Sequence, residues 1–200
     1  MRSTRFYSLG KPGESSSYIL YYFRQENNLS LTHFLSTPEG LDNTIKYIVF
    51  VDDVVISGTQ AQKYLKNVCK KFGKDRDIIL LTFFATDEAI ELLKKQNIRV
   101  ISSINLDDRS KCFSDVSATF NNFKNHQNNC ERFIRHYGSK AQPDAALGYG
   151  NGQYTFGFFY NTPDNTLPIF WSEKPGWKPV VKRYDKKYKG EAINDLGKFI

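Results

Sequence analysis

The chain has 200 residues, of which 40% are hydrophobic and 15% aromatic, a composition that suits one globular domain with a sizeable core. Its formal net charge of +7 favours anionic ligands. It contains neither an apolar run of the roughly 18 residues that a membrane span needs nor an N-terminal apolar stretch of signal-peptide length, so we expect a cytoplasmic protein with no membrane association.

The first predicted elements enclose a loop rich in glycine and serine. Residues 5–9 are predicted as a short strand, and residues 15–27 as a helix with a serine N-cap. Residues 10–17 between them form turns and include a lysine. Such a loop can bind phosphate, because the first N–H groups of a helix have no intrahelical partner.

A second and stronger motif follows at residues 47–60, which read YIVFVDDVVISGTQ. The apolar run of residues 47–51 is typical of a buried parallel strand, and it ends at Asp52 and Asp53. A Ser-Gly-Thr turn then opens a helix. Because ligands of open α/β sheets bind beyond the carboxyl ends of the strands, this motif predicts a ligand that carries hydroxyls, phosphate and Mg²⁺.

The rest of the chain first alternates regularly between predicted strands and helices, and then becomes irregular. Helices are predicted at residues 59–71 and 87–96, and strands at residues 77–85 and 98–102. This βαβαβ run predicts an α/β fold with a parallel sheet. Further along, we expect a polar helix at residues 114–137, a turn-rich and then strand-like stretch at 144–160, and a short helix at 190–200.

The C-terminal part concentrates positive charge. Residues 171–190 contain seven basic and two acidic residues, interleaved with aromatic side chains. Such a strip is either a solvated lysine-rich tail or a surface that binds nucleic acid, since basic groups contact phosphates and aromatic rings stack on bases.

Residues 48–55 resemble the fingerprint of type I phosphoribosyltransferases: four apolar residues, two acids, two apolar residues and a short loop rich in Thr and Gly. Residues 147–153 (LGYGNGQ), 161–171 (NTPDNTLPIFW) and 176–183 (GWKPVVKR) resemble a divergent bacterial subgroup found in conflict loci, including retron-type anti-phage systems. The resemblance implies a Rossmann-like parallel sheet in residues 1–140, and a hood-like C-terminal cap with a basic aromatic tail in residues 141–200.

The resemblance also implies roles for individual residues in a magnesium-dependent glycosyltransferase that acts as a toxic effector of antiviral defence. Asp52 and Asp53 would hold the ribose hydroxyls of phosphoribosyl pyrophosphate, with Mg²⁺ bound indirectly beside them. The 5′-phosphate loop would comprise Ser57, Gly58, Thr59 and Gln60. The pyrophosphate loop would comprise Gly10, Lys11, Gly13, Ser15 and Ser16. Weaker candidates for the acceptor site are Tyr149, Asn151 and Trp171.

Other readings of the same residues stay open. Ile56 stands where some members of the family carry an acidic general base, which favours a non-catalytic nucleotide sensor. Partners from a defence complex, or nucleic acid on residues 171–190, would suit a binding protein. Asp107 and Asp108 follow the last predicted strand and could complete the acidic cluster of a Toprim-like nuclease. The three cysteines and three histidines show no spacing typical of a structural zinc site.

Overall fold

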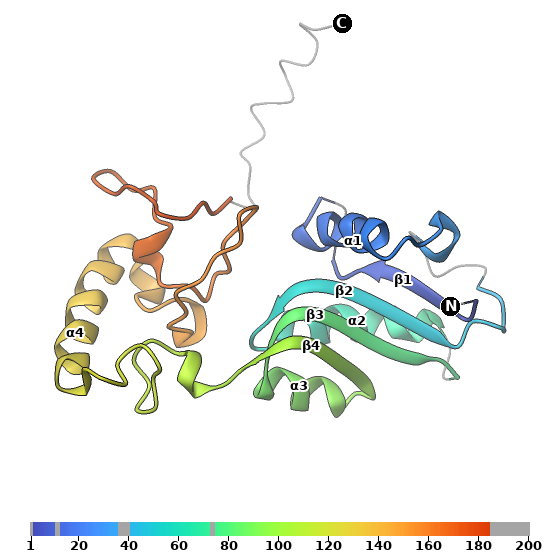
Figure 1. The fold of residues 1–200 in the computed structure, drawn as a ribbon, viewed down its shortest axis with the longest axis horizontal. Helices are drawn as coiled ribbons and strands as arrows, with labels where there is room; N and C mark the ends of the chain where they lie inside the picture. The colour runs from blue at the N-terminus through green and yellow to red at the C-terminus, as the bar shows by residue number, and fades with distance from the viewer. Residues whose placement is uncertain (1, 11–12, 36–40, 73–74, 185–200) are drawn as a thin grey trace, which may run out of the picture.

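The structure is a computed structural model that describes residues 2–10, 13–35, 41–72 and 75–184. Lys11, the end of the basic strip and the helix predicted at residues 190–200 lie outside these ranges. Four parallel strands form one sheet in the order β1-β2-β3-β4 (Figure 1). The strands are β1 (Thr4–Ser8), β2 (Tyr47–Val55), β3 (Asp77–Thr86) and β4 (Ile98–Leu106). The predicted α/β class with a parallel sheet is therefore confirmed.

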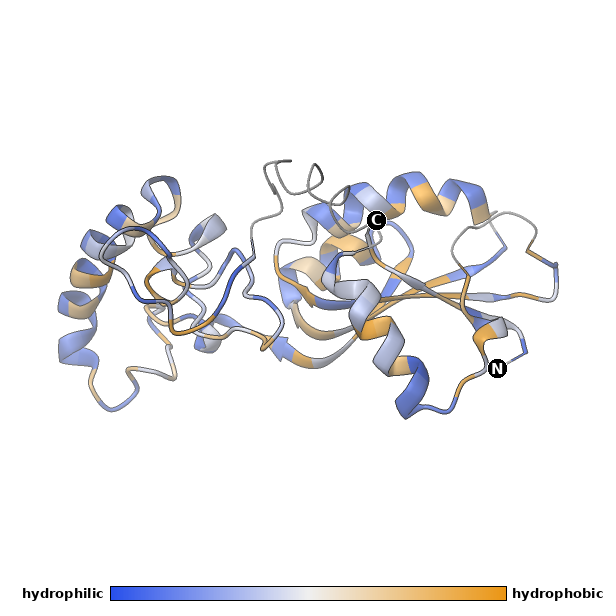
Figure 2. Cartoon of the chain, turned by 90° about the horizontal axis from the view of Figure 1, so that it is seen from above, coloured by the Kyte–Doolittle hydropathy of each residue, from blue (hydrophilic) through white to orange (hydrophobic). Residues whose placement is uncertain are grey.

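Helices cover both faces of the sheet. On one face, α1 (Ser15–Glu26) packs Leu20 and Phe23 against Phe6 and Val49. On the other face, α2 (Thr59–Phe72) and α3 (Asp87–Lys94) enclose the main core. That core contains Ile48, Phe50, Leu65, Phe72, Leu80 and Leu93, each almost or completely inaccessible to solvent. Figure 2 shows the matching orange, hydrophobic segments running through the sheet and along the helices.

A second hydrophobic cluster lies beyond the sheet. It joins Cys112 and Phe113 to Leu147 and Leu167, and α4 (Lys124–Ala141) contributes Ile134 to its edge. Short 3₁₀ turns surround it at Asp108–Ser110, Pro143–Ala145, Tyr149–Asn151 and Pro168–Phe170. The cluster takes residues from both sides of position 140, and the division of the chain there stays a prediction.

An aromatic segment connects this second cluster to the sheet. Residues 154–160, here called the aromatic arm, place Phe156 and Phe158 against Phe84 of β3, with ring centroids 5.1 and 5.8 Å apart. Tyr160 at the end of the arm lies 5.4 Å from the ring of Tyr18 on α1. Figure 1 shows this orange segment between α4 and the ends of the strands.

Three local predictions differ from the structure. β2 continues through both acids to Val55 instead of ending before them. The helix predicted from residue 114 begins only at Lys124, because Ser117 bonds the carbonyl of Cys112 and the N–H of Thr119 and so stabilises turns. The strand-like stretch at residues 144–160 forms only one bridge, between Tyr154 and Thr166.

The main core predicts a large cost for truncation at its centre. Leu80 is fully buried in β3, so Leu80→Ala should lower the free energy of unfolding by about 2–5 kcal/mol, measured by urea denaturation. Phe83→Ala on the same strand is the control, because Phe83 is exposed and its loss should cost much less. Equal costs for the two variants would contradict this packing.

Candidate functional site

The two acids lie at the carboxyl end of the sheet, between two loops that each lead into a helix. Asp52 pairs with Thr82 of β3, and on the other side the N–H of Leu9 donates to the carbonyl of Val51 at 3.0 Å. This last hydrogen bond holds Leu9 to β2, so the loop that starts at Gly10 begins beside the acids. Both Asp52 and Asp53 are half-buried.

Burial and like charge dominate the electrostatics of the pair. Burial, and then the neighbouring carboxylate of Asp53, raise the pKa of Asp52 well above its usual value of 3.8. A backbone hydrogen bond with Asp53 acts in the opposite direction, and the charge of Glu14 adds to the rise. Asp53 in turn accepts a hydrogen bond at 2.8 Å from the N–H of Val54. Both effects therefore shift the equilibrium of Asp52 towards its protonated form, relative to an exposed aspartate.

Gly10, at the start of the first loop, lies close to both α1 and α2. Gly10 has a φ of +116°, and the space of a Cβ there is taken by the Glu14 carboxylate. Its carbonyl accepts a bond at 3.2 Å from the hydroxyl of Tyr64 on α2. Ser16, in the first turn of α1, is fully buried and its hydroxyl has no hydrogen-bond partner within the described residues. Gly13, at φ +90°, is open to solvent, and Ser15 is half-buried.

The second loop, residues 56–60, is held in place by contacts with the start of α3. Gly58 has a φ of +69°, and a Cβ there would lie 3.2 Å from the backbone of Ala89. Thr86 donates a hydrogen bond at 2.5 Å to the carbonyl of Ile56. The hydroxyl of Ser57 accepts from the N–H of Thr59 at 3.3 Å. Because α2 begins at Thr59, the bend presents the exposed start of a helix.

The aromatic arm brings a residue to the acids that the sequence did not single out. Burial, followed by the charges of Asp53 and Asp52, raises the pKa of Tyr160 above its usual 10.0, so its hydroxyl stays protonated. That hydroxyl is buried and has no hydrogen-bond partner among the described residues. The alternating aromatic residues before it in the sequence were the available signal, but they predict a strand and not a contact with the acids.

Comparison with known proteins identifies the family. The family model named PRTase-CE matches residues 1–183. This chain belongs to the PRTase-CE family. The phosphoribosyltransferase-like family predicted from residues 48–55 is thereby confirmed.

Other comparisons of the PRTase-CE chain are more limited. No curated protein matches it. Among solved structures, an orotate phosphoribosyltransferase from Aeropyrum pernix is 25% identical, over 52% of this chain, with a TM-score of 0.35. The match spans 60% of that enzyme's length.

The three acceptor candidates of the PRTase-CE chain lie in or at the end of the short 3₁₀ turns beside the second cluster. The carbonyl of Tyr149 accepts from Asn165 at 2.9 Å, and the indole N–H of Trp171 donates to the carbonyl of Thr166 at 3.0 Å. Asn151 completes the 3₁₀ turn that begins at Tyr149. No hydrogen bond or ring contact within the described ranges joins them to the acids, and their role stays a prediction.

The acids after β4 do not extend the acidic pair. Asp107 caps a 3₁₀ turn by accepting from the N–H of Arg109 at 2.9 Å, and Asp108 forms an ion pair at 2.8 Å with Lys111. In the part of the chain that the structure describes, no group of three potential metal ligands is found. The nuclease alternative therefore has no supporting cluster there. Nor does any described helix have the length and apolarity needed to cross a membrane.

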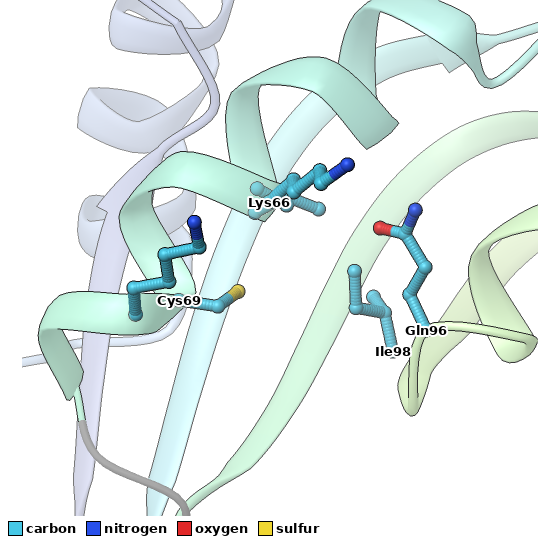
Figure 3. Close-up of a pocket in the computed structure, with 6 residues that line it drawn as sticks. Lys66, Cys69, Gln96 and Ile98 are labelled. Carbon is cyan, nitrogen blue, oxygen red and sulfur yellow. The ribbon is translucent and has the colours of Figure 1, made fainter.

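A cavity of about 280 Å³ lies at the opposite end of the sheet (Figure 3). It is lined by Leu65, Lys66, Cys69, Lys70, Gln96 and Ile98. Ile98 begins β4, so the cavity belongs to the amino ends of the strands. Burial raises the pKa of the Cys69 thiol to about 11, which keeps it protonated and poorly nucleophilic at neutral pH.

The raised pKa of Asp52 predicts a stability that depends on pH. The folded protein holds this proton more tightly than the unfolded chain, so stability falls as pH rises from 3.8 towards the folded value. Asp52→Asn removes this cost. It should therefore raise Tm at pH 7, and the gap should close as the pH is lowered to 4.

Thermal melts of the wild type and the variant between pH 3 and pH 8 measure this gap. Asp77→Asn is the control, since Asp77 is exposed at the other end of the sheet and should shift Tm little. A gap between wild type and Asp52→Asn that does not change with pH would contradict the assignment.

Proposed function

We propose that this protein binds phosphoribosyl pyrophosphate with Mg²⁺ and transfers the phosphoribosyl group to an acceptor. The observation that carries the proposal is the half-buried, like-charged pair of Asp52 and Asp53, set between two helix-initiating loops in a chain of the PRTase-CE family. A ligand with a diol and two phosphate ends matches this order of groups.

Each part of the ligand has a matching group in the site. The carboxylates of Asp52 and Asp53 accept hydrogen bonds from the ribose hydroxyls. The 5′-phosphate binds at the bend from Ser57 to Gln60, where the first N–H groups of α2 and its dipole favour an anion. The pyrophosphate binds at residues 10–16, where the unpartnered hydroxyl of Ser16 can donate to it.

The donor set at the acids suits Mg²⁺. Asp52 and Asp53 are adjacent carboxylates, and after burial the charge of Asp53 is the next cause that raises the pKa of Asp52. Mg²⁺ usually binds one or two carboxylates and completes its shell with water and substrate phosphates. Asp52 and Asp53 would hold it in this way, and when bound it would supply charge neutralisation for the leaving pyrophosphate.

The chemistry requires positive charge to be stabilised on the sugar. The bond from C1′ to pyrophosphate breaks with its electron pair leaving on pyrophosphate, and a nucleophilic atom of the acceptor bonds to C1′. The sugar is oxocarbenium-like between these events, so carboxylates already placed at its hydroxyls stabilise it. Most of the rate gain comes from such positioning and preorganised charge.

A second candidate is a sensor that binds the nucleotide without turnover. Ile56 favours it, because an apolar residue stands where an acidic general base would be expected, and its carbonyl is engaged by Thr86. In either case, the conflict-locus resemblance of residues 147–183 supports a role in anti-phage defence, as a toxic effector if the protein is catalytic.

The acidic pair gives the main test of the proposal. Asp53→Asn should lower the affinity for phosphoribosyl pyrophosphate or its turnover at least tenfold, about 1.4 kcal/mol, because it halves the charge offered to the diol and the cation. Calorimetric titration with and without Mg²⁺ measures the affinity. Asp115→Asn, at an exposed position after β4, is the matched control. Wild-type affinity in Asp53→Asn would refute the assignment of the pair.

Release of pyrophosphate separates the two candidates. An enzyme releases it steadily when the acceptor is present, and slowly to water when it is absent. Saturable binding with no release under any acceptor mixture tested would favour the sensor.

Tyr160 provides a second test, in which protein stability and ligand affinity should change in opposite directions. Tyr160→Phe removes a buried hydroxyl that has no partner, so the ligand-free protein should become slightly more stable. Affinity for phosphoribosyl pyrophosphate should fall about 2- to 10-fold, the worth of one hydrogen bond. Thermal melts and titration measure the two. Unchanged affinity would show that this hydroxyl does not reach the ligand.

A further inference from the structure

A row of aromatic rings runs from the surface of α1 to the acidic pair. We call it the aromatic ridge; it comprises Tyr21, Tyr22, Tyr18, Phe159 and Tyr160. Tyr21 and Tyr22 lie 5.2 Å apart, Tyr22 and Tyr18 4.8 Å, and Tyr18 and Phe159 6.0 Å. The ridge joins two segments that are more than 130 residues apart in the sequence, as the numbering of Tyr22 and Phe159 shows.

The ridge is exposed at its outer end and along its length. Phe159 is 84% exposed and Tyr21 52% exposed, and Tyr18 and Tyr22 are also exposed. The hydroxyl of Tyr160, at the inner end, is buried. Contiguous exposed rings on a soluble domain are uncommon without a partner, so the ridge is a surface for binding rather than part of the core.

Charge beside the ridge favours an anionic partner. The guanidinium of Arg24 lies over the ring of Tyr21 at 5.9 Å. Residues 182–184 run alongside the end of the arm: Thr162 donates to the carbonyl of Lys182 at 2.6 Å, and the N–H of Tyr184 donates to Asn161 at 3.1 Å. Arg183 of this segment is paired with Asp164, so Arg24 is the cation that the described contacts place on the ridge.

Acidic groups are also present, and they limit where the anion can lie. Glu14 and the acidic pair border the inner end of the ridge, and Glu26 closes α1. Phosphates are therefore expected along the outer end, by Arg24, while the inner end accepts an uncharged ring.

We propose that the aromatic ridge binds single-stranded nucleic acid by stacking bases on Tyr22, Tyr18 and Phe159. Stacking needs open ring faces, and a row of several rings offers more of them than one free base can use. Arg24 at the outer end contacts the backbone. The inner end, at Tyr160, sets a stacked base beside Asp52 and Asp53. The proposal concerns binding, goes beyond the transfer reaction and can fail independently of it.

Fluorescence anisotropy with a labelled 12-nucleotide single strand, of DNA or RNA, tests the proposal on the full chain. Phe159→Ala and Tyr22→Ala should each weaken binding about 5- to 150-fold, the range measured for loss of one stacked base. Both side chains are exposed, so the variants should fold, which a thermal melt checks. Phe123→Ala is the control, since Phe123 is 61% exposed at the start of α4 and lies outside the ridge.

The outcomes separate the possible partners. Wild-type affinity in both ridge variants would overturn the proposal, and so would binding to phosphatidylserine vesicles without binding to the strand. A mononucleotide that displaces the strand completely, and binds as tightly as the strand does, would show that the ridge holds a single base. That result would also overturn the proposal. Affinity for phosphoribosyl pyrophosphate is measured on the same samples. If the wild type binds the strand but does not bind phosphoribosyl pyrophosphate, the result contradicts the proposed transferase and leaves the ridge proposal standing.

Discussion

The burial of two adjacent carboxylates, Asp52 and Asp53, is the constraint on which this structure depends. A strand interior is an unfavourable place for charge, and burial with like charge drives Asp52 towards its neutral form. The rest of the fold surrounds that point with groups that can offset the cost: two helix starts, a buried serine hydroxyl and a buried phenol. Sites that bind ligands commonly keep such locally unfavourable arrangements, because the ligand and not the apo protein relieves them.

Much of the sheet could be predicted from the sequence. Apolar runs at residues 47–51 and 77–85 identify buried parallel strands because both of their faces are covered, and the helices between them follow from apolar spacing. The end of β2 was missed for a physical reason. Its pairing with β3 continues through Asp52 and Val54, and backbone bonds do not depend on whether a side chain is polar.

The remainder of the site depends on contacts between distant segments. The spacing of residues 154–160 indicates an extended chain, but only the stacking of Phe156 and Phe158 on Phe84 shows where that chain lies. Likewise, Tyr18 and Tyr22 fit an ordinary packing stripe on α1 until Phe159 lies beside them. Single-sequence patterns report local periodicity, and they carry no information on which aromatic stripes end up facing each other.

The aromatic arm has a thermodynamic consequence for the molecule as a whole. It extends from the second hydrophobic cluster and rests on Phe84 and Tyr18, above the acids. Any molecule held between the acids and Tyr160 would touch both halves of the chain at once. Linkage then works in both directions. The bound molecule strengthens the docking of the arm by the same factor by which a docked arm strengthens the binding of the molecule. Residues far from the acids, in the cluster around Leu147 and Leu167, would thereby contribute to the affinity for such a molecule without contacting it.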